Sequence, residues 1–240
     1  MIPISDNTRS RTFPVVNYTL IAINLIVFFY ELSLGDCSGF ERCRLDTFID
    51  GRGVVPDLYL SGDSESIFLD PFTAMFIHAG WLHLIGNMLF LWVFGDNVED
   101  SMGHVKYLLF FLICGYIATL AHVAANVDDT IPAIGASGAI SGVLAAYLII
   151  FPKATVTALV PFFLFIPTQV PAFLMIGLWF LLQLSYGTAS FDPSTSATDT
   201  TAYWAHIGGF VAGVGLVWFF RGPRDKTPYE RALEPRDSWP

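Results

Sequence analysis

Residues 107–127 read YLLFFLICGYIATLAHVAANV and contain no Asp, Glu, Lys or Arg. A helix needs about 20 largely apolar residues to cross the hydrocarbon core of a bilayer, and this stretch supplies them. We therefore interpret residues 107–127 as a membrane-spanning helix.

The composition of the whole chain agrees with this interpretation. Hydrophobic residues make up 54% of the 240 residues and charged residues only 14%, and the mean hydropathy is +0.56. Ordinary globular proteins carry about 25% charged residues, and a soluble fold of this size could not bury so much apolar surface. The net charge of −9 also offers no basic face for phosphates, which argues against a nucleic-acid partner. The composition predicts an integral membrane protein in contact with lipid.

Five further stretches have the length and character of spans, so the expected fold class is an all-α membrane protein with six transmembrane helices. Pro161, Pro167 and Pro171 indicate that residues 154–170 form a loop, although they are uncharged. We expect residues 1–14 to form an N-terminal segment, 15–220 the six-span domain and 221–240 a disordered tail. The five further spans are Val15–Tyr30 (with Glu31 near its end), Pro71–Gly95, Thr130–Pro152, about Pro171–Gly187 and Thr200–Phe220.

The distribution of basic residues predicts the orientation in the membrane. With six spans both termini lie on one side, and nine of the 12 Lys and Arg residues then fall on that side. The positive-inside rule makes this side the cytoplasm. The long segment 35–70 consequently lies outside, where we expect it to have structure of its own. Its two cysteines, Cys37 and Cys43, either form a disulfide or remain two thiols, whereas Cys114 is interpreted as a packing residue.

Three clusters of polar residues lie within the expected spans, where polar groups are costly. The second span contains HAGWLHLIGN, in which His83 and Asn87 share a helix face. The fourth opens with GASGAISG around Ser137, and the sixth contains AHIGGFVAG around His206. Because these three spans all run inward, the four side chains are predicted to reach a similar depth, roughly 10 Å below the outer helix ends.

Small residues indicate which of these spans touch. Gly138 and Gly142 on the fourth span, and Ala205, Gly209 and Gly213 on the sixth, would allow close approach of the two backbones. This approach would bring the hydroxyl of Ser137 within reach of His206.

A serine beside a neutral imidazole is the arrangement of an activated nucleophile. Acyl transfer also needs hydrogen-bond donors for an oxyanion, which His83, Asn87 and the backbone N–H of Ser137 could supply. No carboxylate is expected at this depth to orient His206, so the residues favour a Ser–His dyad over a triad.

These motifs resemble those of the rhomboid family of intramembrane serine proteases. The matching residues are His78, His83 and Asn87 in the second span, Gly135, Ser137 and Gly138 in the fourth, and Ala205, His206 and Gly209 in the sixth.

The resemblance implies a rhomboid-type bundle with Ser137 as nucleophile and His206 as base. His83 and Asn87 would line the oxyanion hole, and His78 is either structural or takes part directly. Implied substrates are single-span membrane proteins that enter from the bilayer and are cut near the outer end of their helix. The implied enzyme uses no cofactor or metal, and its fifth span and the segment 188–200 gate the site.

One departure affects the base. Some family members carry a Tyr four residues after the serine, stacked on the catalytic histidine, whereas this chain has Ser141. We expect Gly135, Gly138, Ser141 and Gly209 to be structural residues near the site.

Two other classes of function fit the sequence less well. A catalytically inactive, rhomboid-like adaptor would usually lack the serine or the histidine, and this chain has both. A transporter would be expected to carry charged groups along its spans, yet only Glu31 falls within one.

The compact length of the chain suggests that the protein is an enzyme of a bacterial cytoplasmic membrane.

Overall fold

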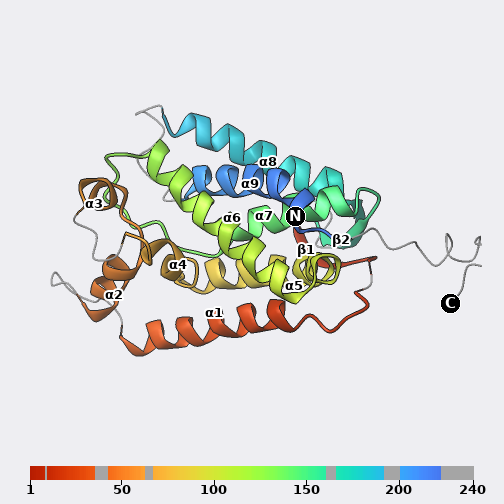
Figure 1. Ribbon diagram of the computed structural model, residues 1–240, viewed down its shortest axis with the longest axis horizontal. Coiled ribbons are helices and arrows are strands. Elements are labelled where there is room, and N and C mark those ends of the chain that lie inside the picture. Colours follow the sequence, from red (N-terminus) through yellow and green to blue (C-terminus); the bar gives the residue numbers. More distant parts are fainter. Residues whose placement is uncertain (9, 36–42, 63–66, 161–165, 192–200, 223–240) are drawn as a thin grey trace, which may run out of the picture.

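The structure is a computed structural model that describes residues 1–8, 10–35, 43–62, 67–160, 166–191 and 201–222. It is predominantly helical, with one small antiparallel sheet (Figure 1). In chain order the elements are β1 (Ile2–Asp6), α1 (Val15–Ser33), α2 (Arg44–Arg52), α3 (Pro56–Ser61), α4 (Asp70–Ala74), α5 (Trp81–Met102), α6 (His104–Ala125), α7 (Ser137–Ile150), β2 (Thr155–Leu159), β3 (Pro167–Pro171), α8 (Ala172–Ala189) and α9 (Tyr203–Phe220).

Four helices of the described chain, α1, α6, α8 and α9, are long and apolar enough to cross a membrane. Helix α7 is apolar but has only 14 residues. Helix α5 has 22 residues, and its last two turns carry Asp96, Glu99 and Asp100.

Helix α7 lies at the centre of the bundle. All its residues from Gly138 to Tyr147 are buried, and α5, α6 and α9 pack around it. Helices α7 and α9 approach each other closely, as the small residues predicted. A Cβ added to Gly209 would lie only 1.9 Å from the carbonyl oxygen of Gly138, so no larger residue fits there. The predicted approach of these two segments is confirmed.

The predicted span Pro71–Gly95 is wrong in its extent. Helix α4 ends at Ala74 and α5 begins only at Trp81, so His78 lies in the connection between them. The backbone N–H of His78 donates instead to the carboxylate of Glu31 on α1, at 3.3 Å to each oxygen. Beyond Gly95, α5 continues to Met102, because its acidic residues find partners in the N-terminal segment and at the start of α1.

The predicted start of the fourth span at Thr130 is also wrong, since helix α7 begins at Ser137. Residues 127–136 before it are not helical, and Ala133 forms a β-bridge with Val54. Gly135 has a φ of +113° and donates its N–H to the carbonyl of Ala74. Ser137 is therefore preceded by irregular chain rather than by helical turns.

The sheet corrects the all-helical prediction. Strand β1 pairs antiparallel with β2, Ile2 opposite Leu159, and β2 pairs with β3, Thr155 opposite Pro171. Alternate residues of β2, Val156 and Ala158, are fully buried, as expected for a strand with one face on the core. The sheet lies at one end of the bundle and α2, α3 and α4 at the other (Figure 1).

The fifth predicted span corresponds well to α8, which begins directly after β3. Cys43 is disulfide-bonded and Cys114 is a buried free thiol. Cys37, the segment 192–200 of the expected gate and most of the expected tail lie outside the described residues, so those expectations stay predictions.

Candidate active site

Ser137 and His206 are brought into direct contact. Ser137 is the first residue of α7 and His206 the fourth of α9, and the Ser137 Oγ lies 2.7 Å from the Nε2 of His206. This distance is that of a good hydrogen bond. The juxtaposition of the two side chains, predicted from the glycine stripes, is present in the structure.

The other ring nitrogen of His206 contacts a residue that was not predicted from the sequence. The Oε1 of Gln183, on α8, lies 2.7 Å from His206 Nδ1. Its sign in the sequence is an amide in a largely apolar helix. A search for carboxylate partners of the base overlooks an amide. The aromatic ring of Trp179, one turn earlier on α8, lies 5.8 Å from the imidazole.

His83 and Asn87 face the connection that precedes Ser137. A Cβ built on Gly135 would lie 2.6 Å from His83 Nε2 and 3.7 Å from Asn87 Nδ2. The Nδ1 of His83 accepts a 3.4 Å hydrogen bond from the N–H of Ala79, so Nε2 carries the ring proton of the neutral imidazole. The Nδ2 of Asn87 is buried without a hydrogen-bond partner among the described residues. Two donors are thus aimed at the chain just before Ser137.

A third donor comes from the backbone. As the first residue of α7, Ser137 has an N–H without an acceptor in the preceding turn of the helix. Helix N-termini also favour negative charge through the helix dipole.

His78 is buried next to His83. Its ring lies 5.0 Å from that of His83, and neither of its ring nitrogens has a hydrogen-bond partner in the described structure. The ring of His78 therefore packs against that of His83. Across the described residues, no three His, Cys, Asp or Glu side chains gather into a metal site.

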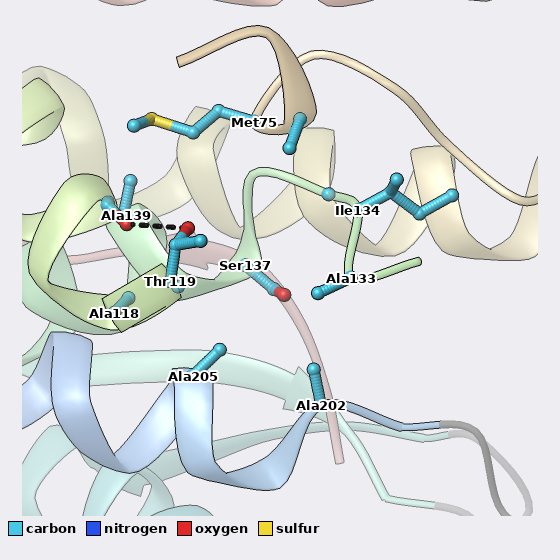
Figure 2. Close-up of a pocket in the computed structure, with 13 residues that line it drawn as sticks. Met75, Ala118, Thr119, Ala133, Ile134, Ser137, Ala139, Ala202 and Ala205 are labelled. Atoms are coloured by element: carbon cyan, nitrogen blue, oxygen red, sulfur yellow. Dashed lines mark hydrogen bonds between the residues drawn. The ribbon is translucent and has the colours of Figure 1, made fainter. Parts of the chain in front are cut away.

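A pocket lined mainly by alanine and glycine adjoins Ser137 (Figure 2). The Ser137 side chain lies between the Ala133–Ile134 segment on one side and Ala202 and Ala205 of α9 on the other. Such walls leave room for a small side chain.

Comparison with known proteins agrees with the motifs. A family model described as the rhomboid domain matches residues 67–223, more than half of the chain. The chain belongs to the rhomboid family. Together with its apolar helices, this makes the chain an integral membrane protein.

Three relatives illustrate the breadth of the rhomboid family. The chain is 28% identical over 173 residues to Rhomboid-like protein 11, chloroplastic, of Arabidopsis thaliana, which covers 72% of this chain and 59% of the relative. It is 29% identical over 170 residues to Rhomboid protein 1, mitochondrial, of Saccharomyces cerevisiae, covering 68% and 45%. It is 27% identical over 200 residues to Rhomboid protease GluP of Bacillus subtilis, covering 83% and 34%. The chain thus spans about a third to three fifths of the length of these relatives.

Proposed function

We propose that this protein is an intramembrane serine endopeptidase that cleaves single-span membrane proteins near the outer end of their transmembrane helix. The observation that carries the proposal is the 2.7 Å contact between Ser137 Oγ and His206 Nε2. The name of the relative Rhomboid protease GluP supports the same class of reaction.

In the proposed first step, Ser137 Oγ attacks the carbonyl carbon of the scissile peptide while His206 Nε2 takes the hydroxyl proton. The carbonyl oxygen becomes an oxyanion that accepts hydrogen bonds from His83, Asn87 and the Ser137 N–H. His206 then gives its proton to the leaving nitrogen, the C–N bond breaks, and an acyl-enzyme ester remains. Water, deprotonated by His206, attacks this ester and releases the second product.

The pocket beside Ser137 supports a preference for substrates with a small residue at the cleavage site. Ala118, Ala133, Ala202 and Ala205 form much of its wall. A larger substrate side chain would have to displace these walls, which belong to three different parts of the bundle.

The proposal includes six membrane spans, with α5 and α7 crossing alongside α1, α6, α8 and α9. The segment 35–70, which holds α2 and α3, then lies outside and both termini lie in the cytoplasm, as the bias of basic residues supports. We assign the protein to a bacterial cytoplasmic membrane, although rhomboid relatives also carry mitochondrial and chloroplastic names. Membrane fractionation tests the assignment to the cytoplasmic membrane, and the accessibility of a tag fused to the C-terminus tests the assignment of that terminus to the cytoplasm.

The decisive experiment measures cleavage of a single-span reporter by purified protein in proteoliposomes. Wild type is expected to cleave the reporter and to be labelled by a fluorophosphonate probe, whereas Ser137→Ala should do neither. Ser185→Ala is the matched control, because Ser185 is an exposed serine whose hydroxyl donates to the Leu181 carbonyl of its own helix. Cleavage by Ser137→Ala at the wild-type rate contradicts the mechanism, and a folded wild type that is neither active nor labelled would be the inactive adaptor.

A further inference from the structure

Gln183 is the polar residue through which α8 reaches the candidate active site. It is one of only five buried residues that the structure describes on this helix, and its exposed fraction is 8%. The serine and threonine of α8, Ser185 and Thr188, are by contrast exposed and donate to carbonyls of their own helix. Burial of an amide in a membrane helix is costly unless its hydrogen bonds are made.

The partners of Gln183 determine how its amide is oriented. Its Nε2 donates to the carbonyl oxygen of Trp179, at 3.3 Å, and a carbonyl can only accept. The Oε1 is thereby directed to His206 Nδ1, 2.7 Å away. The reverse orientation would set the NH₂ group against Nδ1 and leave two acceptors facing each other at Trp179.

This orientation dictates where the proton of His206 resides. Because Oε1 can only accept, Nδ1 must carry the proton, and the Nε2 of the neutral ring then has its lone pair directed at Ser137. In the opposite tautomer Nε2 would already hold a proton and could not take that of the serine. Serine hydrolases with a triad obtain the same tautomer from a buried carboxylate.

We propose that Gln183 is a positioning residue that holds His206 in the tautomer able to activate Ser137, the role that a carboxylate plays in a catalytic triad. The inference rests on the proposed function, because it concerns the base of that reaction. A neutral amide meets the need without placing a charge at membrane depth, where ionised side chains are expensive.

A consequence is that the base depends on the packing of α8 against α9. Gln183 and His206 lie on different helices, which are held together next to the site by the stacked rings of Phe180 and Phe210, 4.1 Å apart. Separation of the two helices would break the hydrogen bond between Gln183 and Nδ1 and allow His206 to adopt the other tautomer.

The first test compares variants of Gln183 in the reporter assay. Gln183→Met keeps the shape but removes the acceptor, and it should lower kcat by about 10- to 100-fold with KM changed less than about 2-fold. Gln183→Glu restores an acceptor and should recover most of this loss. Ser185→Ala, on the same helix, should keep the wild-type rate, and Gln183→Leu repeats the test if Gln183→Met does not fold.

The second test observes the tautomer itself, so that it does not depend on activity. In protein labelled with ¹⁵N-histidine, the signals of His206 are assigned by comparison with His206→Ala. Wild type should show protonated Nδ1 and unprotonated Nε2, and Gln183→Met should shift the population toward protonated Nε2.

The outcomes separate this inference from the proposed function. Gln183→Met with the wild-type kcat and the wild-type tautomer overturns the role of Gln183. A tautomer shift in Gln183→Met, in a protein whose wild type neither cleaves nor is labelled, supports the positioning of His206 and contradicts the protease instead.

Discussion

The hydroxyl of Ser141 donates a 2.6 Å hydrogen bond to the carbonyl oxygen of Ser137, one turn earlier on α7. Ser141 therefore bonds within its own helix and does not hold His206, although it occupies the position from which some family members present a tyrosine. The aromatic neighbours of His206 come instead from α8 and α9, where the rings of Trp179 and Tyr203 lie 5.8 Å and 6.5 Å away. Apart from its contact with Ser137, His206 is therefore held by side chains of α8 and α9 rather than of α7.

Ser141→Ala should consequently be almost neutral. A hydrogen bond from a serine to the carbonyl four residues earlier adds little to helix stability, and alanine is the better helix former. We expect reporter cleavage within about 2-fold of wild type and a change in unfolding free energy below about 1 kcal/mol. Ser141→Tyr should unfold the protein, because Ser141 is fully buried. A large loss of cleavage in a folded Ser141→Ala protein would show that Ser141 acts on the base.

Gly209→Ala should strongly destabilise the protein, although alanine normally stabilises a helix. The new Cβ would lie 1.9 Å from the carbonyl oxygen of Gly138, so α7 and α9 would be forced apart. Overpacking of this kind costs about 1–3 kcal/mol or more, and the displacement would also separate Ser137 from His206. Both the thermal midpoint in detergent and the cleavage rate should fall.

The control for this prediction is Gly215→Ala on the same helix. No atom lies within 4 Å of a Cβ at Gly215, so this variant should gain up to about 1 kcal/mol from helix propensity. Equal thermal midpoints for the two variants would contradict the close packing of α7 and α9.

Gly135→Ala should lower activity more than stability. Gly135 has a φ of +113°, which L residues rarely adopt, and a Cβ there would lie 2.6 Å from His83 Nε2. The ring of His83 would have to move away from the place proposed for the oxyanion. Removal of one such donor costs about 100-fold or more in kcat, and we expect a loss of at least about 10-fold.

Gly86→Ala is the matched control for Gly135→Ala, because a Cβ at Gly86 on α5 meets nothing within 4 Å. Its kcat should equal that of wild type. If Gly135→Ala also retained the wild-type kcat, His83 could not be an oxyanion donor at its present position.

The contact of Ser137 with His206 could be predicted because it follows from local patterns. Small residues recur every fourth position on both segments, and this period places Gly138 and Gly209 on the faces that meet. Uncharged stretches likewise located the four helices that are long and apolar enough to cross a membrane, α1, α6, α8 and α9, since the preference of apolar side chains for lipid does not depend on tertiary contacts.

The breaks in these segments could not be predicted, because they depend on distant partners. The chain at His78 is not helical, and its N–H donates to Glu31 on α1. Ala133 likewise forms a β-bridge with Val54, which lies far away in the sequence. Neither partner is evident from the local sequence. Gln183 was missed for the same reason, since only the packing of α8 on α9 directs its amide to the base.

Glu99, near the end of α5, is a buried acidic residue that binds the start of α1. Its carboxylate is fully buried and accepts hydrogen bonds from the backbone N–H groups of Val16, at 2.9 Å, and Asn17, at 2.7 Å. The residue before α1 is Pro14, which offers no side-chain cap, so α5 provides the cap of α1. The Nδ1 of His104 also contacts this carboxyl group, 2.5 Å from its Oε1.

Glu99→Gln should therefore destabilise the protein by about 2 kcal/mol or more, because one acceptor is replaced by a donor that faces N–H groups. Detergent-induced unfolding measures the change. Asp128→Asn is the control, since Asp128 is exposed and its replacement should cost less than about 0.5 kcal/mol. The start of α1 should also exchange its amide protons faster in Glu99→Gln, while the exchange of α9 is unchanged. Equal stability of the two variants would mean that α1 is held by its apolar contacts alone.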